Sequence, residues 1–366
     1  MQVPVGRRSL LSDKAKFIVA VGGVALAIVL MLVFISLYEG VRRETASFVQ
    51  SMPGDIWVTQ EGTTDLIFSD SYLPESAAVD AAGMEGVIGV DRLYGRLVSF
   101  AVGGEDVRSY VMALSPDETL ARPGLEEFMP EPGAIILDNT FARQAGLSVG
   151  DTLSFADEEL TVSEIRHVGN VLVAQFSWVS AEDFARFFGV PDIVNFILVS
   201  AKDGFTDEVV SGLREEIPGS SVNTTDGFAG LASETGTADF LPIIRVEVVI
   251  SFIVGISILS LVVYSATIER ARDYAIMKVL GASPLRLYRI VLGQSSIIAA
   301  LGFVIGVGLT FVVNSVAGDL VPQFVTYIRW QDVVLVFAFV VVMTLVSSFT
   351  PLHRIARVEP ATVFRA

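Results

Sequence analysis

The chain has 366 residues, of which 52% are hydrophobic and only 18% are charged, and its mean hydropathy is +0.60. This composition excludes an ordinary soluble protein, so part of the chain must face lipid. The absence of cysteine excludes a disulfide framework, a thiolate metal site and a cysteine nucleophile. The net charge of −16 argues against a nucleic-acid partner, because phosphate contacts need a clustered basic face.

Four long runs without a charged residue predict four membrane-spanning helices. The first, residues 17–38, would form a helix roughly 33 Å long, enough to cross a hydrocarbon core of about 30 Å. A cleavable signal peptide is the alternative, but its apolar region is usually only about 7 to 15 residues long. No small-x-small cleavage site follows the run, so an uncleaved anchor is favoured. The other runs are residues 248–268, 290–318 and 333–352.

The third run is longer than the bilayer requires, so we expect it either to tilt or to project beyond the membrane. It contains Gly302 and Gly306, followed by Gly308. This small-xxx-small pattern either lets two helices approach closely or is a chance pattern, since it is frequent in membrane helices.

The distribution of Lys and Arg predicts the orientation of the four helices. Residues 1–16, 269–289 and 353–366 together hold 12 basic and 4 acidic residues. Residues 39–247 hold 12 basic and 35 acidic residues, a net charge of −23. Because Lys and Arg are in excess on the cytoplasmic side, we expect cytoplasmic termini and a cytoplasmic second loop. Residues 39–247 are then extracytoplasmic, and 319–332 form a short outer loop.

The large segment 39–247 mixes β-rich runs with short helices, which predicts an α+β domain inserted between the first and second helix. Its negative charge is explained by a solvated surface that keeps the domain soluble, although a cationic ligand is an alternative. Residues 39–50 continue the first helix, and 226–245 enter the second span without a long linker. These segments are either rigid stalks that transmit motion or simple tethers. We expect helices at 139–145, 181–188 and 206–216, and strands at 55–60, 87–102 with a break around Tyr94-Gly95, 107–114, 133–137, 152–155, 160–167, 171–179 and 194–199.

Catalytic motifs are absent from the sequence. An ATPase needs a Gly-rich loop that ends in Gly-Lys-Ser/Thr, but none of the four lysines follows a glycine. No His-Glu-x-x-His or Gly-x-Ser-x-Gly motif occurs in the sequence. The only histidines are His167, expected in a strand as a surface or locally hydrogen-bonded residue, and His353, expected as an interface anchor. The spans also lack the ionisable residues of a proton or sodium relay. We therefore expect a non-catalytic subunit without a metal or cofactor of its own.

The loop between the second and third spans is too polar to cross the membrane and too patterned to be a flexible tether. It predicts a short helix with exposed apolar groups that ends at Gly281. Ser283-Pro284 then begins the next helix, with Ser as the cap and Pro at the first position. The loop reads Glu269-Arg270-Ala271-Arg272-Asp273-Tyr274-Ala275-Ile276-Met277-Lys278-Val279-Leu280-Gly281-Ala282-Ser283-Pro284.

This loop resembles that of the MacB/FtsX-like permeases of ABC transporters, which typically runs Glu-Arg, an acidic residue, small and aliphatic residues, and then Leu-Gly-Ala-Ser. The large insertion after the first span, residues 146–155 and the tail 357–361 are also similar to the family. Residues 53–60 and 65–74 look similar to its stand-alone DevC/HrtB-like branch. Asp273-Tyr274 departs from the common Glu followed by an aliphatic residue, but charge and bulk are retained.

The resemblance implies that the loop is a coupling helix, docked in a groove of a separate cytoplasmic ATPase that binds ATP and Mg. It also implies a homodimer of permeases in the cell membrane. The alternative for the charged residues at the start of the loop is that they only anchor the second span at the interface. The docking residues implied are Glu269, Arg270, Arg272, Asp273, Tyr274, Ala275, Met277, Lys278, Leu280, Gly281, Ala282 and Ser283.

Three functions fit these observations. The resemblance favours ATP-driven export or extraction of a hydrophobic or amphiphilic substrate by mechanotransmission. The second is an FtsX-like mechanotransmitter that regulates an extracytoplasmic enzyme without transporting a substrate. The third is a membrane-anchored sensor or adaptor without energy coupling. The sequence predicts no substrate-binding residue.

Overall fold

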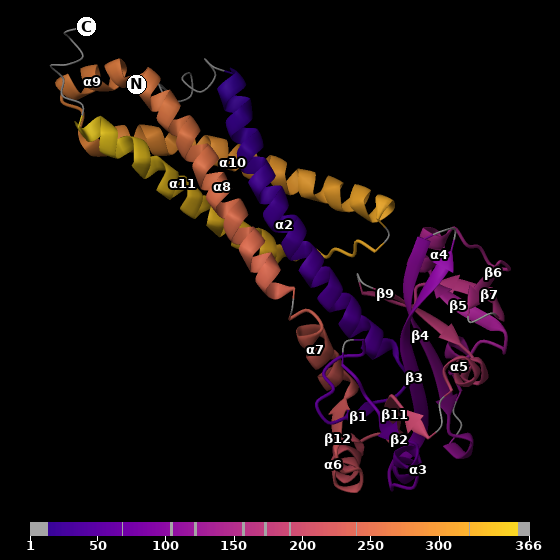
Figure 1. Ribbon diagram of the computed structural model, residues 1–366. Coiled ribbons are helices and arrows are strands. Elements are labelled where there is room, and N and C mark those ends of the chain that lie inside the picture. Colours follow the sequence, from indigo (N-terminus) through magenta and orange to yellow (C-terminus); the bar gives the residue numbers. More distant parts are fainter. Residues whose placement is uncertain are drawn as a thin grey trace. The chain divides into compact units, whose positions relative to one another are not determined.

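The computed structural model describes residues 14–67, 69–102, 105–120, 123–155, 158–171, 174–189, 192–238, 240–321 and 323–357. The described chain forms two compact units (Figure 1). The helical unit contains the described residues within 1–38, 240–316 and 326–366. The sheet unit contains those within 39–239 and 317–325.

Four long helices have the length and apolar composition needed to cross a membrane: α2 (Lys14–Ser51), α8 (Leu241–Glu269), α10 (Pro284–Leu320) and α11 (Trp330–Arg357). Each contains one of the four uncharged runs, so the predicted spans are confirmed as helices of sufficient length. The first helix is unbroken to Ser51, as expected for residues 39–50. A short helix, α9 (Ala271–Val279), lies between α8 and α10.

Glycines bring the helices of the helical unit into close contact. A Cβ atom at Gly302 of α10 would lie 2.7 Å from Cγ1 of Val24 in α2, and one at Gly306 would lie 2.9 Å from the carbonyl oxygen of Ala25. Gly308 has no such neighbour within 4 Å. The small-residue pattern therefore serves close packing at Gly302 and Gly306, because only a residue without a side chain leaves room for the second helix.

The sheet unit contains a ten-stranded mixed sheet in the order β12-β1-β11-β3-β4-β9-β5-β7-β6, with β8 paired to β9. The pairs β4–β9 and β5–β7 are parallel and the other pairs are antiparallel. A separate antiparallel pair joins β2 and β10. The strands are β1 (Ile56–Gln60), β2 (Leu73–Pro74), β3 (Val87–Val102), β4 (Glu105–Pro116), β5 (Ala134–Asp138), β6 (Thr152–Phe155), β7 (Glu158–Arg166), β8 (Asn170–Val171), β9 (Ala174–Val179), β10 (Ile193–Val194), β11 (Phe196–Ala201) and β12 (Ser220–Thr224).

Short helices complete the sheet unit, and three of them have the predicted bounds. In two of these, local caps define the ends. Asp138 accepts a hydrogen bond from Thr140 N at the start of α4, and Ser180 accepts one from Asp183 N at the start of α5. Both helices end at a glycine in the left-handed region. The helices are α3 (Ser76–Ala82), α4 (Asn139–Ala145), α5 (Ala181–Phe188), α6 (Thr206–Glu216), α7 (Thr225–Thr235) and the 3₁₀ turns η1 (Glu118–Leu120) and η2 (Glu126–Phe128).

The prediction of a break around Tyr94-Gly95 in the strand 87–102 is wrong. Strand β3 is continuous and pairs with β4 without interruption from Asp91 to Val102. Gly95 stays in the strand because a Cβ there would lie 2.4 Å from the ring of Tyr110, so a glycine is needed for this close approach. The structure also adds elements that the sequence did not predict, namely α3, α7, β2 and β12.

Two other strand predictions differ from the structure. The run 171–179 is divided between β8 and β9, and 194–199 spans the end of β10 and most of β11. The predicted turn at Ala156 and Asp157 lies outside the described residues, although the flanking strands β6 and β7 pair as an antiparallel hairpin.

Aromatic side chains form much of the core of the sheet unit. The rings of Phe48 and Phe176 are stacked with centroids 3.9 Å apart, and Trp57 stacks on Phe228 at 4.9 Å. Such pairs add to the stabilisation that comes from burying their surface. Residues of α2 beyond position 38 thus belong to the core of this unit.

Candidate functional site

The turn from α8 through α9 to α10 carries the residues predicted to dock an ATPase (Figure 1). Glu269 is the last residue of α8, and Arg270 lies in the turn before α9. Arg272, Asp273, Tyr274, Ala275, Met277 and Lys278 lie in α9. Leu280, Gly281, Ala282 and Ser283 form the turn that leads into α10.

The end of α9 has the hydrogen bonds of a Schellman motif. Gly281 has a φ of +86°, and its N–H donates to the carbonyl of Lys278 at 3.1 Å. Ala282 N donates to the carbonyl of Met277 at 2.9 Å. These two bonds satisfy carbonyls that would otherwise be free, so the helix ends sharply, as the sequence predicts.

The next helix begins directly after this motif. The backbone carbonyl of Ser283 accepts hydrogen bonds from Arg286 N at 2.9 Å and Leu287 N at 3.3 Å. Pro284 is the first residue of α10, where its missing N–H is no loss.

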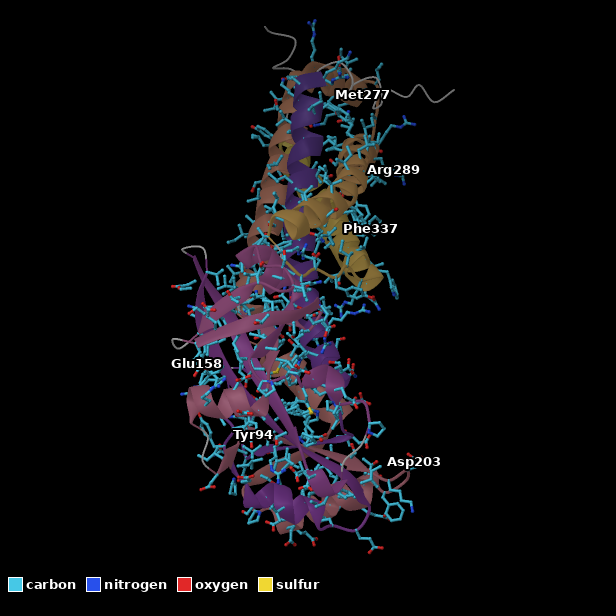
Figure 2. The ribbon with its side chains drawn as sticks, turned by 90° about the vertical axis from the view of Figure 1, so that its right-hand side faces the viewer. Tyr94, Glu158, Asp203, Met277, Arg289 and Phe337 are labelled. Carbon is cyan, nitrogen blue, oxygen red and sulfur yellow. The ribbon has the colours of Figure 1, made fainter. Side chains whose placement is uncertain are left out.

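One face of α9 packs into the helical unit. Tyr274 and Ala275 are each only 4% exposed, and Met277, labelled in Figure 2, is partly buried against the same core. Burial raises the pKa of the Tyr274 hydroxyl, which therefore stays neutral. These three residues belonged to the predicted docking set, but their side chains hold α9 to the helical unit.

The opposite face of α9, together with Leu280 in the turn after it, exposes apolar side chains. Val279 is 59% exposed, Leu280 is 81% exposed, and Ile276 is also exposed. Ile276 and Val279 were missing from the predicted docking set, although the helical spacing of 276, 279 and 280 places them on one face. We call Ile276, Val279 and Leu280 the apolar patch of α9. Charged Arg272 and Asp273 are exposed on the same short helix.

Glu269 forms an ion pair with Lys16 of α2. Both side chains are about half exposed, so the pair contributes at most about 1 kcal/mol to stability. Glu269 is thus accessible at the end of α8. Its ion pair with Lys16 adds too little stability to be a strong structural reason for a glutamate at this position.

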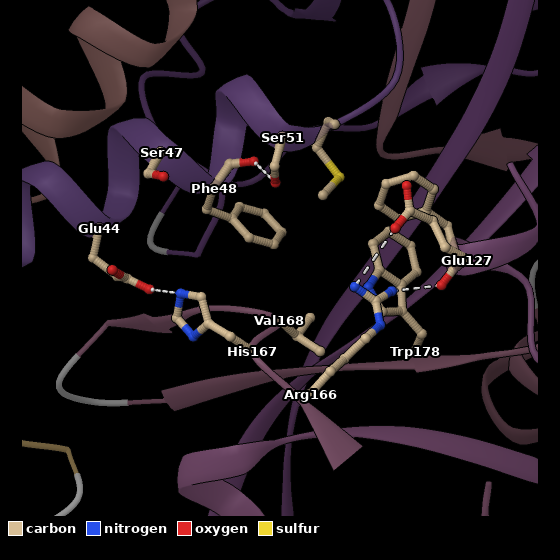
Figure 3. Close-up of a pocket in the computed structure, with 11 residues that line it drawn as sticks. Glu44, Ser47, Phe48, Ser51, Glu127, Arg166, His167, Val168 and Trp178 are labelled. Atoms are coloured by element: carbon tan, nitrogen blue, oxygen red, sulfur yellow. Dashed lines mark hydrogen bonds and ion pairs between the residues drawn. The ribbon is translucent and has the colours of Figure 1, made fainter. Parts of the chain in front are cut away.

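A second candidate site is a cavity in the sheet unit, bounded by the end of α2, η2, the end of β7 and β9 (Figure 3). His167 stands beside it, with Nε2 2.8 Å from Oε1 of Glu44 and Nδ1 3.4 Å from Oδ2 of Asp138. His167 is thus exposed and locally hydrogen-bonded, as predicted, but it lies just after β7, which ends at Arg166, and not in the strand. In the described part of the chain, no group of three or more His, Asp or Glu side chains is arranged to hold a metal ion.

Comparison with known proteins matches both parts of the chain to a family. The family described as MacB-like periplasmic core domain matches residues 17–216, and FtsX-like permease C-terminal matches residues 245–360. The chain belongs to the MacB/FtsX-like ABC transporter permeases. The permease is therefore a membrane protein with four spanning helices and an α+β extracytoplasmic domain between the first two.

Relatives of the permease carry the same description. An uncharacterized ABC transporter permease of Mycobacterium tuberculosis H37Rv is 22% identical over 360 residues, covering 96% of each chain. An uncharacterized ABC transporter permease of Methanocaldococcus jannaschii is 26% identical over 242 residues, covering 62% of this chain and 59% of the relative. Relatives described in this way imply an ABC transporter with an ATPase partner.

Solved structures similar to the permease are extracytoplasmic domains. The periplasmic region of MacB from Actinobacillus actinomycetemcomitans is 11% identical with a TM-score of 0.35, covering 47% of this chain and 89% of that one. The extracellular domain of the ABC-type transporter YknZ from Gram-positive bacteria is 11% identical with a TM-score of 0.33, covering 46% and 98%.

Proposed function

We propose that the permease couples ATP hydrolysis by a separate cytoplasmic ATPase to the export or extraction of a hydrophobic or amphiphilic substrate. The chain is then the non-catalytic membrane subunit, and ATP and Mg are bound only by the ATPase. Two permeases act as a homodimer in the cell membrane. Both termini and α9 are cytoplasmic in this proposal, which rests on the excess of Lys and Arg in those segments.

The apolar patch of α9 is the observation that carries this proposal. Val279 and Leu280 are exposed although they lie outside the predicted spans, where neither lipid nor the rest of the described chain covers them. Burying a side chain of this kind contributes about 1.5–3 kcal/mol. A short helix that offers an apolar face next to charged residues fits docking into a groove of a partner.

The ATPase partner is tested by co-purification with Leu280→Asp. This change should weaken binding of the ATPase at least about tenfold, because a charge replaces a buried apolar contact. Leu320→Asp is the matched control, since Leu320 is 76% exposed at the other end of α10. Equal co-purification of both variants would exclude docking through α9.

An apolar hollow in the helical unit supports the proposed substrate class. It has a volume of about 320 Å³ and lies between α10 and α11, within the predicted spans. Such a hollow suits a hydrocarbon chain better than a polar solute, because its walls offer few hydrogen bonds. Its lining residues are Leu292, Ser296, Ala299, Ala300, Phe303, Phe337, Val340, Val341, Thr344 and Leu345, of which Phe337 is labelled in Figure 2.

The continuity of α2 favours the mechanotransmitter as the second candidate function. This helix contains the first predicted span and also supplies Phe48 and Val49 to the core of the sheet unit. Stimulation of ATP hydrolysis by a defined amphiphile would favour export. A strict requirement for an external hydrolase, with no response to amphiphiles, would favour the purely mechanical role.

A further inference from the structure

The apolar hollow between α10 and α11 is delimited along its length by aromatic rings. Phe303 and Phe337 both line it, and their rings meet edge to face with centroids 5.2 Å apart. About one helical turn beyond its other end, the ring of Tyr288 contacts that of Phe349 with centroids 5.7 Å apart. Each pair joins one residue of α10 to one of α11, so ring contacts between the same two helices mark both ends of the hollow.

The walls of the hollow suit a hydrocarbon chain. They are mostly apolar, and the hydroxyl of Thr344 donates to the carbonyl of Val340 at 2.7 Å within its own helix. Ser295 and Ser348 are fully buried, and the Ser348 hydroxyl donates to that of Ser295 at 3.1 Å, which ties α10 to α11. The hollow is only partly enclosed and lies within the predicted spans, so its open side faces lipid. An acyl chain can therefore enter from the bilayer without breaking these hydrogen bonds.

The length of the hollow corresponds to one leaflet of a bilayer. Its lining residues on α10 extend from Leu292 to Phe303, which is roughly 16 Å at 1.5 Å per residue. A hydrocarbon core of about 30 Å gives about 15 Å for each leaflet. The volume of about 320 Å³ lies at the lower end of the range for ligand sites, about 300–1,000 Å³. The hollow therefore fits one acyl chain rather than a whole lipid.

Two exposed arginines, Arg286 and Arg289, lie in the first turns of α10, close to the end of the hollow. At 3.6 residues per turn, Arg289 is only about 20° away from Ser296 around the helix. Ser296 lines the hollow, so Arg289 lies on the same face of α10. Along the length of the helical unit, Arg289 lies between Met277 and Phe337 (Figure 2).

The two arginines have no carboxylate to neutralise them in the described part of the chain. Neither forms an ion pair there, and residues 274–318 contain no Asp or Glu. Side chains of a helix point towards its N-terminus, so the Arg289 side chain is directed away from the hollow, towards the membrane surface. The phosphate of a phospholipid lies at that surface, next to its acyl chains. Guanidinium groups bind phosphate through strong, often bidentate hydrogen bonds.

We propose that the permease binds one anionic phospholipid, with an acyl chain in the hollow between α10 and α11 and the phosphate at Arg289. Arg286 lies one turn earlier and adds a second positive charge, which favours a head group with a net negative charge. Basic residues beside a groove between membrane helices are a known arrangement for binding anionic lipids.

This site deepens the proposed function and rests on it, because it names an anionic phospholipid as the amphiphile that enters the hollow. Binding of the lipid requires no ATPase. Loss of lipid binding and loss of ATPase docking are therefore separate results, and either can fail while the other holds.

Native mass spectrometry of the full-length permease in detergent tests this binding. The permease is titrated with phosphatidylglycerol and with phosphatidylcholine that carry the same two oleoyl chains. We expect phosphatidylglycerol to bind about tenfold more tightly, because the cationic amine of phosphatidylcholine offsets the charge of its phosphate. Equal affinities for the two lipids would overturn the proposal.

Arg289→Gln should weaken the binding of phosphatidylglycerol about tenfold, because glutamine lacks the positive charge. Arg272→Gln is the matched control, since Arg272 is exposed on the neighbouring helix α9. It removes the same charge from a different helix, so phosphatidylglycerol should bind as it does to the unmodified permease. Equal weakening in the two variants would mean that overall charge alone attracts the lipid, which would overturn the proposal.

Filling the hollow tests the place of the acyl chain. Ala300 lines the hollow and is exposed, so Ala300→Phe should occupy its space and weaken the binding of both lipids at least about tenfold. Ala338 is exposed on α11 but does not line the hollow, so Ala338→Phe should bind both lipids as the unmodified permease does. Equal binding by these two variants would also overturn the proposal. Because Arg289→Gln changes only an exposed side chain, that comparison remains decisive even if Ala300→Phe does not fold.

Discussion

Gly306 of α10 lies against the backbone carbonyl oxygen of Ala25 in α2, at a distance that leaves no room for a side chain. A Cβ atom at position 306 would be 2.9 Å from this oxygen and also 2.9 Å from Cβ of Ile28. A backbone oxygen cannot move aside to make room, whereas the end of a flexible side chain can. The close approach of α10 to α2 at this point therefore requires a glycine at position 306.

Gly306→Ala should destabilise the permease by about 1–3 kcal/mol, because the added methyl group forces α10 away from α2. The melting temperature in detergent measures this effect. Gly308→Ala is the control, because nothing lies within 4 Å of that position. Its melting temperature should be unchanged or slightly higher, since alanine favours a helix over glycine. Equal melting temperatures for the two variants would disprove the packing role of Gly306.

Gly281→Ala should strain the end of α9, because a residue with a side chain adopts a φ of +86° at a cost of about 1–2 kcal/mol. We expect weaker ATPase binding, since the strained turn adjoins Leu280. Binding of the ATPase to the purified variant checks this. Gly293→Ala, in the helical part of α10 with no neighbour within 4 Å, should bind the ATPase as the unmodified permease does.

Asp138→Asn should lower the free energy of unfolding by about 2–3 kcal/mol. The buried carboxylate accepts from Thr140 N at 2.7 Å through one oxygen, and from Val168 N at 2.9 Å and Gly169 N at 3.0 Å through the other. An amide has one acceptor oxygen, so at least one of these N–H groups would face a donor. Thermal unfolding measures the loss.

Asp151→Asn is the control for that experiment. Its carboxylate accepts from Ser148 N at 2.7 Å but is exposed, so water can replace the bond. We expect a change within about 1 kcal/mol. A loss at Asp151 equal to that at Asp138 would contradict the role given to the buried carboxylate.

Alkaline pH should destabilise the sheet unit through its buried tyrosines. Burial raises the pKa of Tyr110 and of Tyr94 above the ordinary value of about 10. Below pH 10 both states of the protein keep these hydroxyls protonated, so stability is fully present. Above pH 10 the unfolded state ionises first, so stability falls as pH rises towards the folded-state pKa values. Tyr110→Phe should flatten this fall in chemical unfolding measured between pH 8 and pH 11, and an unchanged slope would contradict it.

Elements with strong local signals were predicted well. The bounds of α4, α5 and α6 agree with the structure. For α4 and α5, residues within a few positions set both ends, through the caps at Asp138 and Ser180 and the glycines that follow. Strand β3 was predicted with a break because Gly95 is unfavourable in a strand, yet the ring of Tyr110 on the neighbouring strand needs the space that this glycine leaves. No local pattern contains that information.

The loop between α8 and α10 shows the same division. Its helix and its end at Gly281 were predicted, since the Schellman motif depends on residues adjacent in sequence. The buried face was not predicted, because Tyr274 and Ala275 are covered by residues of other helices. For the same reason the exposure of Ile276 and Val279 was not predicted, although their helical spacing with Leu280 was a usable signal.

By itself, the sequence determined the four apolar helices, the α+β insertion after the first of them and the sharp turn after α9, because hydrophobic run length and capping act over a few neighbouring residues. Only the tertiary structure decided which face of α9 is free and which glycines of α10 touch α2. It also assembled the cavity from Phe48, Phe128 and Trp178, which lie far apart in the chain. Which side chains are buried depends on residues that pack together from distant parts of the chain. The order of residues along the chain does not show these contacts.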